Sequence, residues 1–243
     1  MDTLKHIAPL MAALDDGYKH RSHEMLGWFL SHFLAQMGRP EWMSVPEDMR
    51  PRMDAAIEVY ADLVKKAPPF HDLLGPLYME IGSRGGRQQL GQFFTPWPIA
   101  AMMARMTMGG RPSETASGRL LNVCDPAVGS GVMMLAFVEA VLEAWGPDEL
   151  RLVSITGCDL DGYCARMFPV QAVVNCAVHG LQLGEIIAYR GNSLSSEQPE
   201  IVLHASAPGR PVAPANHPAR VVALKEAAVQ QAGQLQLFGE QAA

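Results

Sequence analysis

Between residues 120 and 204, short apolar runs alternate with longer segments of helical character, and this alternation constrains the fold more than any other feature. The apolar runs lie at 120–125, 152–159, 186–189 and 200–204, and the helical segments lie at 131–145 and 161–179. Such alternation is typical of βαβ units, which build a parallel sheet. The sequence therefore predicts an α/β fold with a Rossmann-like sheet of about three to four parallel strands.

The first part of the chain has a different texture. Apolar residues recur at spacings of three and four, in one set at Met25, Leu26, Phe29, Leu30, Phe33 and Leu34, and in another at Met53, Ile57, Tyr60, Ala61 and Val64. This spacing predicts amphipathic helices. We therefore expect a helical N-terminal domain at 1–83, an α/β domain at 84–208 that begins with a helix at about 98–108, and a Pro-rich segment, helix and tail at 209–243.

Composition narrows the classes of protein to which the chain can belong. Hydrophobic residues make up 49% of the 243 residues and charged residues 18%, which is ordinary for a globular protein. The net charge of −6 means that any contact with nucleic acid must come from a local patch. The sequence shows no apolar run long enough to cross a membrane and no apolar core of a secretory signal. We expect a cytoplasmic protein.

Neither the cysteines nor the histidines predict a metal site or a disulfide. Cys124, Cys158, Cys164 and Cys176 contain no CxxC pair, which fits reduced, packed thiols. His20 and His23 share a helical segment, but no third ligand follows at a useful spacing.

A small-residue turn at 125–131, Asp-Pro-Ala-Val-Gly-Ser-Gly, follows the first predicted strand and opens a helix. Glycines allow backbone N–H groups to approach a ligand closely, and a helix N-terminus favours a negative group. We interpret this turn as a cofactor loop, although turns of this composition are also common without any ligand.

Two further polar residues are predicted at the same end of the sheet. Asp159 ends the second strand, where a carboxylate can accept both hydroxyls of a ribose; the alternative is a plain strand-end charge, with Asp161 as a helix cap. Asn192 follows the third strand and has an amide that can hydrogen-bond an adenine edge. The order of loop, helix, strand and acid favours nucleoside binding.

These residues resemble a known family, the N6-adenine DNA methylases among the class I S-adenosylmethionine (SAM) dependent methyltransferases, of the kind found as modification subunits of type I restriction-modification systems. The resemblance rests on Gly-Gln-Phe-Phe-Thr-Pro at 91–96 and on the run at 125–131, where Val128 replaces a cysteine of the family pattern, and it covers roughly residues 20–204. It implies that SAM is the cofactor and DNA the substrate. The implied cofactor residues are Phe94, Thr95, Pro96, Asp125, Pro126, Ala127, Gly129, Ser130, Gly131, Asp159 and Asn192.

The chain departs from the family at the catalytic motif. That motif, Asn or Asp followed by Pro-Pro and an aromatic, follows the fourth strand, and its groups hold and stack on the flipped base. If 200–204 is that strand, then Ala205, Ser206, Ala207 and Pro208 stand in its place, and both the acceptor and the aromatic are missing. The resemblance therefore implies an adenine-N6 methyltransferase that is impaired or depends on a partner. The alternative is an inactive accessory subunit that keeps the SAM pocket.

Two expectations concern partners. In the family the fourth strand lies beside the first, so a sheet that stops there leaves an open edge, which predicts a homodimer or a partner subunit. The tail residues Gln234, Leu235, Gln236, Leu237 and Phe238 resemble the short peptide by which bacterial proteins dock on the sliding clamp. In that interpretation Leu237 and Phe238 fill an apolar pocket and Gln234 is a polar anchor; the alternative is a helix end that packs Leu235 and Phe238 on its own domain.

Overall fold

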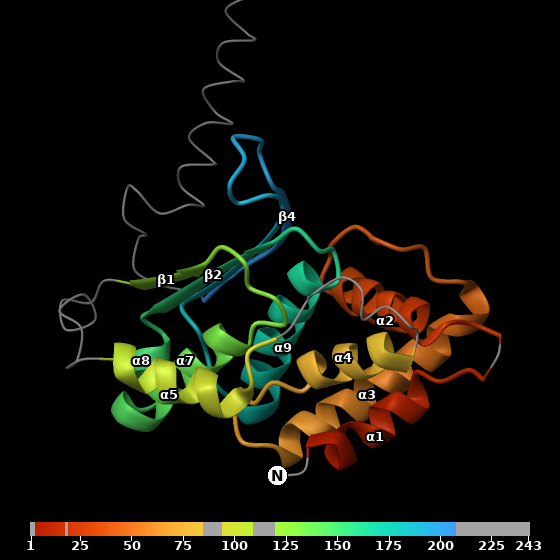
Figure 1. The fold of residues 1–243 in the computed structure, drawn as a ribbon, viewed down its shortest axis with the longest axis horizontal. Helices are drawn as coiled ribbons and strands as arrows, with labels where there is room; N and C mark the ends of the chain where they lie inside the picture. Colours follow the sequence, from red (N-terminus) through yellow and green to blue (C-terminus); the bar gives the residue numbers. More distant parts are fainter. Residues whose placement is uncertain (1–2, 18, 85–93, 109–119, 208–243) are drawn as a thin grey trace, which may run out of the picture.

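The computed structural model describes residues 3–17, 19–84, 94–108 and 120–207. A sheet forms one layer, helices from the later part of the chain pack beneath it, and a bundle of helices from the first third of the chain lies to one side (Figure 1). The predicted final helix and the 234–238 peptide lie outside the described residues.

The structure confirms the helices that the apolar spacing predicts in the first part of the chain. The elements of this helical region are α1 (Thr3–Ala13), α2 (Ser22–Gln36), the 3₁₀ turn η1 (Glu47–Met49), α3 (Arg50–Lys66) and α4 (Leu74–Arg84). Helix α3 begins with a proline in its first turn and ends with Lys65 and Lys66, both favourable positions. It buries one stripe of residues at helical spacing, Met53, Ala56, Tyr60, Leu63 and Val64.

The α/β region follows the predicted order. Its elements are α5 (Trp97–Thr107), β1 (Leu121–Asp125), α7 (Val132–Trp145), α8 (Pro147–Leu150), β2 (Val153–Asp159), α9 (Cys164–His179), β3 (Glu185–Arg190) and β4 (Glu200–Ser206). Strands β1, β2 and β3 pair in parallel, with Asp125 opposite Gly157 and Asp159 opposite Arg190. Their carboxyl ends, and the loops that follow them, therefore meet at one edge of the sheet.

Strand β4 corrects the predicted topology. The sheet order is β1-β2-β3-β4, and β4 pairs with β3 in the antiparallel direction, with Glu185 opposite Ser206. The sheet is thus mixed, and the strand at 200–206 is not a fourth parallel strand beside the first. A short connection from β3 allows a hairpin, whereas a parallel strand needs a long crossover. Only nine residues, 191–199, separate β3 from β4.

The two edges of the described sheet are treated differently. At β4, Arg39 donates to the backbone oxygens of Ile201 at 2.8 Å and Val202 at 2.9 Å, which ties this strand to the helical region. On β1, the side chains of Asn122 and Cys124 are exposed. Within the described part of the chain, β1 is an edge strand.

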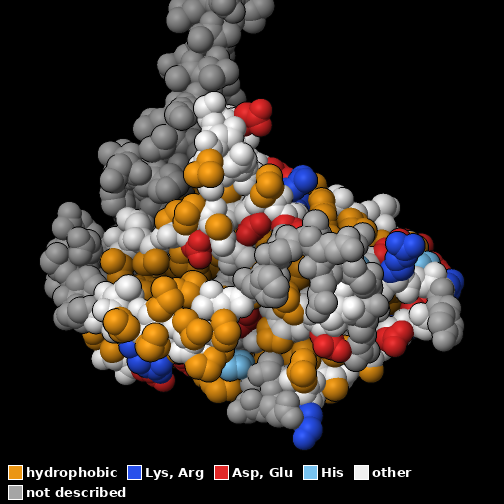
Figure 2. All heavy atoms as spheres, viewed as in Figure 1, with side chains coloured by type: hydrophobic (Ala, Val, Ile, Leu, Met, Phe, Trp, Pro, Cys, Tyr) orange, Lys and Arg blue, Asp and Glu red, His pale blue; other side chains and the backbone are white. Residues whose placement is uncertain are grey.

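One hydrophobic cluster joins the helical region to the sheet. This single cluster of packed side chains includes residues from Ile7 in α1 to Leu203 in β4. Helix α5 packs Ala100 and Ala104 on α7 and exposes a stripe at Ile99, Met102, Met103 and Met106 (Figure 2). No described helix is long and apolar enough to cross a membrane.

Candidate functional site

The carboxyl edge of β1, β2 and β3 brings the predicted residues together. Backbone hydrogen bonds link the loops there: the Val128 amide donates to the oxygen of Cys158 at 2.9 Å, and the Gly191 amide donates to the oxygen of Asp159 at 2.9 Å. The loops after β1 and β3 are thus both fixed to the carboxyl end of β2. This edge is the candidate site.

The glycine loop at 125–131 is a tight turn closed by its own groups. The Asp125 carboxylate accepts the Ala127 amide at 2.9 Å, and the Gly131 amide donates to the oxygen of Val128 at 2.8 Å. Gly129 and Gly131 have φ angles of 54° and 98°. A Cβ on Gly131 would also lie 2.8 Å from the ring of Phe168. These positions therefore require glycine, and the loop leads directly into the N-terminus of α7.

Asp159 contacts the glycine loop across 30 residues of sequence. Its Oδ2 accepts the Gly129 amide at 2.8 Å, and its Oδ1 accepts the Asp161 amide at 2.9 Å. A carboxylate has about four lone-pair positions, so two remain for a ligand. The predicted loop and the predicted acid therefore form one unit.

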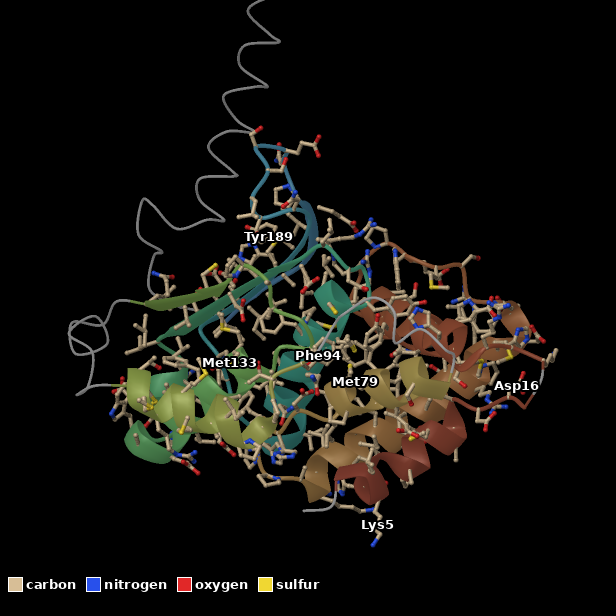
Figure 3. All side chains as sticks on the ribbon, in the orientation of Figure 1. Lys5, Asp16, Met79, Phe94, Met133 and Tyr189 are labelled. Carbon is tan, nitrogen blue, oxygen red and sulfur yellow. The ribbon has the colours of Figure 1, made fainter. Side chains whose placement is uncertain are left out.

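The predicted segment Phe94–Pro96 lies on the other side of this loop. The Phe94 ring is 3.2 Å from where a Cβ of Gly129 would be. Phe94, Thr95 and Pro96 line a cavity of about 260 Å³, with Met79 on its α4 side (Figure 3). The other residues around this cavity are His71, Asp72, Gly75, Pro76, Trp97 and Pro98.

Two predicted residues are engaged in contacts of their own. Ser130 is fully buried, and its hydroxyl donates to Asp72 at 2.8 Å. Asn192 is exposed, and its side-chain oxygen accepts the Leu194 amide at 3.0 Å, which closes a local turn. The hydrogen bonds described for Asn192 and for the Asp159 side chain therefore do not join these two residues.

The structure adds residues that the sequence did not single out. Tyr78 from α4 stacks on Phe94, with ring centroids 5.8 Å apart, and donates to Asp161 at 3.2 Å. Burial raises the pKa of Tyr78, so its hydroxyl stays protonated. The ring centroids of Tyr163 and His23 are 3.9 Å apart. His23 therefore makes an aromatic contact between the helical and α/β regions. The buried Asp72 was also missed; its polar side chain in the apolar run 70–77 was the available signal.

The residues that stand in the place of the family's catalytic motif lie elsewhere. Ser206 pairs with Glu185, the first residue of β3, so Ala205 and Ser206 are at the amino edge of the parallel strands. Placing the motif at 205–208 assumed that 200–204 is a parallel strand. Because β4 is antiparallel, that assumption does not hold. Pro208 lies outside the described residues.

Comparison with known protein families gives a match that includes this site. A family model described as N-6 DNA Methylase matches residues 71–216. The chain belongs to the N-6 DNA methylase family. In this methylase-family chain the match covers the glycine loop, Asp159 and the four strands that the structure describes. It also begins within the helical region, at His71, next to Asp72.

Other comparisons add little to the family assignment. No curated protein matches the chain. A solved structure described as a proposed class I S-adenosylmethionine-dependent methyltransferase from Listeria monocytogenes is similar, with 12% identity and a TM-score of 0.43. The similarity covers 79% of this chain and 55% of the other, so the chain spans about half of that protein's length.

Proposed function

We propose that the chain binds SAM at the carboxyl edge of β1–β3 and acts in methyl transfer to adenine N6 in DNA. The observation that supports this most is the bond from the Gly129 amide to Asp159, which joins the glycine loop to an acidic strand end. Parallel α/β sheets bind ligands outside the carboxyl ends of their strands. Family membership supplies the reaction and the nucleic-acid substrate.

The residues present fit the cofactor. Gly129 and Gly131 have left-handed φ angles, and because glycine has no Cβ, a ligand can approach the main chain closely at this loop. In the proposal Asp159 accepts the ribose hydroxyls, the N-terminus of α7 faces the negative end of the ligand, and Asn192 approaches the adenine. The segment Phe94–Pro96, with its cavity of about 260 Å³, holds the methionine part. SAM, when bound, supplies the activated methyl group.

We also propose that methyl transfer by this chain depends on another subunit. The sequence has no Asn-Pro-Pro or Asp-Pro-Pro run, and a group that accepts hydrogen bonds from the target amine is needed near the methyl group. His204 and Ser206, the nearby candidates by sequence, lie on the antiparallel strand β4. The same observation favours the second candidate function, an accessory subunit that binds SAM without transferring its methyl group.

The partners in this proposal are DNA and at least one protein chain. An exposed β1 edge supports a second copy or a partner subunit that pairs with this strand. The peptide at 234–238 is proposed to dock on the sliding clamp. The restriction-modification role and the cytoplasmic location are also proposals drawn from the family.

Calorimetric titration of the full chain with SAM tests the proposed function. We expect saturable binding of SAM and of S-adenosylhomocysteine, with ATP as a control that does not bind. Transfer of labelled methyl groups to adenine-containing DNA, alone and with candidate partner chains, then separates the enzyme from the accessory subunit. A folded chain that binds neither SAM nor its demethylated product contradicts the proposal.

A further inference from the structure

A buried carboxylate of the helical region lies directly against the glycine loop. Asp72 sits between α3 and α4 and is 5% exposed. Its Oδ2 accepts the Ser130 hydroxyl at 2.8 Å, and its Oδ1 accepts the Gly75 amide at 2.9 Å. The first bond crosses from the helical region into the loop that the proposed function assigns to the cofactor.

Gln171 of α9 completes this contact. Its Nε2 donates to Asp72 Oδ1 at 2.7 Å and to the backbone oxygen of Ser130 at 2.9 Å. Its Oε1 accepts the amides of Leu73 at 2.9 Å and Leu74 at 3.0 Å. The side-chain amide thus uses both hydrogens and both lone pairs. Three segments that are distant in sequence share one satisfied polar network.

Close packing and a strained backbone surround this network. A Cβ on Gly75 would overlap the Asp72 carboxylate and lie 2.7 Å from the Ser130 hydroxyl. Just before Asp72, the buried Phe70 has a φ of 61°, and its amide donates to Asn175 at 2.6 Å. Left-handed backbone at a bulky residue persists only where neighbours enforce it. Asp72 is therefore held in place from both sides.

Burial of the Asp72 side chain carries a cost. Desolvation raises the pKa of Asp72, and the hydrogen bonds from Gln171, Gly75 and Ser130 counteract this only in part. An apolar residue would avoid this cost but would leave Ser130 and Gln171 without their partner. Ser130 stands between Gly129 and Gly131, so fixing its hydroxyl and its carbonyl fixes the two glycines as well.

We propose that Asp72 is a positioning residue for the glycine loop: from the helical region it holds Ser130 so that Gly129 and Gly131 are set for the cofactor before the cofactor binds. The identity of that cofactor as SAM rests on the proposed function. The helical region is in this account a structural part of the cofactor site. Displacing it would alter the loop.

Amide hydrogen exchange in the full chain, followed by NMR, tests this proposal without any ligand. The variants are D72A, D72N and S130A, with S31A as a matched control. Ser31 is a buried hydroxyl in α2 that bonds only the backbone of Met43, at 2.8 and 3.0 Å, so S31A removes the same group away from the loop. D72N keeps an oxygen for Gly75 and Gln171, and its amide can donate to the Ser130 hydroxyl.

We expect D72A and S130A to speed exchange of the Gly129 amide roughly ten-fold or more, as the loss of one net hydrogen bond would, and to weaken SAM binding to a similar degree. D72N and S31A should keep the exchange rate of the unsubstituted chain. If D72A does not fold, the pair S130A and S31A decides the result.

The proposal is overturned if the Gly129 amide exchanges at the same rate in all variants, if S31A speeds it as much as S130A, or if D72N fails to restore the rate. If the exchange pattern is as expected but no form of the chain binds SAM, the positioning role stands and the assignment of the cofactor falls.

Discussion

The carboxyl and amino edges of the same sheet differ in how their polar groups are bonded. At the carboxyl edge, the loops after β1 and β3 are bonded to the end of β2, and Asp159 keeps lone pairs that a ligand could use. At the amino edge, Glu185 is fully buried and uses its oxygens on Ser154 and His204, each at 2.8 Å. Strand direction creates this difference, because only parallel strands place consecutive loops at one edge.

Among substitutions at the two edges, the largest effect on SAM affinity is expected at Asp159. D159A removes the acceptor of the Gly129 amide and the proposed acceptor of the ribose. Charge-assisted hydrogen bonds contribute about 1.5–3 kcal/mol each, so we expect SAM affinity to fall by roughly 100-fold or more. Titration calorimetry measures this. D148A, which removes the same charge from exposed Asp148 on α8, is the control and should bind normally.

A second large effect is expected on stability at Gly131. G131A places a Cβ 2.8 Å from the Phe168 ring and forces alanine to a φ of 98°. Left-handed strain and overpacking together should lower the free energy of unfolding by about 2–5 kcal/mol. Denaturant unfolding of G131A beside G180A separates the two causes, because Gly180 has a φ of 63° with open space around it. Equal losses in both variants would show that the packing on Phe168 is unimportant.

A moderate effect is expected at the far side of the sheet. R39A removes two hydrogen bonds to the backbone of β4 and should lower the free energy of unfolding by about 2 kcal/mol. SAM affinity should not change, since β4 contributes nothing to the carboxyl edge in this account. R151A, at an exposed position, is the control for the lost charge. A large loss of SAM affinity in R39A would link β4 to the site.

A smaller, pH-dependent effect is expected from D72N. Burial raises the pKa of Asp72 in the folded chain, so the folded state holds a proton that the unfolded state releases as the pH rises. The unsubstituted chain should therefore lose stability relative to D72N as the pH increases from the unfolded pKa through the folded one. Thermal unfolding of both chains across this range checks the sign. A stability difference that is independent of pH would contradict it.

The smallest expected effect is at the position that was aligned with the family's catalytic motif. Ser206 is exposed and opposite Glu185, at the amino edge. S206A should leave SAM affinity and any methyl transfer within about two-fold of the unsubstituted chain, as exposed substitutions away from a site usually do. A ten-fold loss would mean that β4 reaches the site in solution.

Local patterns in the sequence were sufficient to predict most of the elements and the end of the sheet at which the candidate residues lie. The three parallel strands, their helices, and the meeting of the 125–131 loop with Asp159 were all predicted, because apolar runs and βα spacing depend on residues close in the chain. The direction of β4 was wrong, since a five-residue apolar run carries no information on its partner strand. Asp72 and Gln171 were not predicted, because their role depends on a contact between residues that are 99 positions apart in the sequence.

The central claim is that the ligand site lies at the carboxyl edge and not at the amino edge. The direct test is a titration of the isotopically labelled chain with SAM, followed through the amide resonances of five residues. We expect the resonances of Gly129, Gly131 and Gly191 at the carboxyl edge to shift with saturation, and those of Gly184 and Ser206 at the amino edge to stay unchanged. Shifts confined to the amino edge, or none in a folded chain, would contradict it.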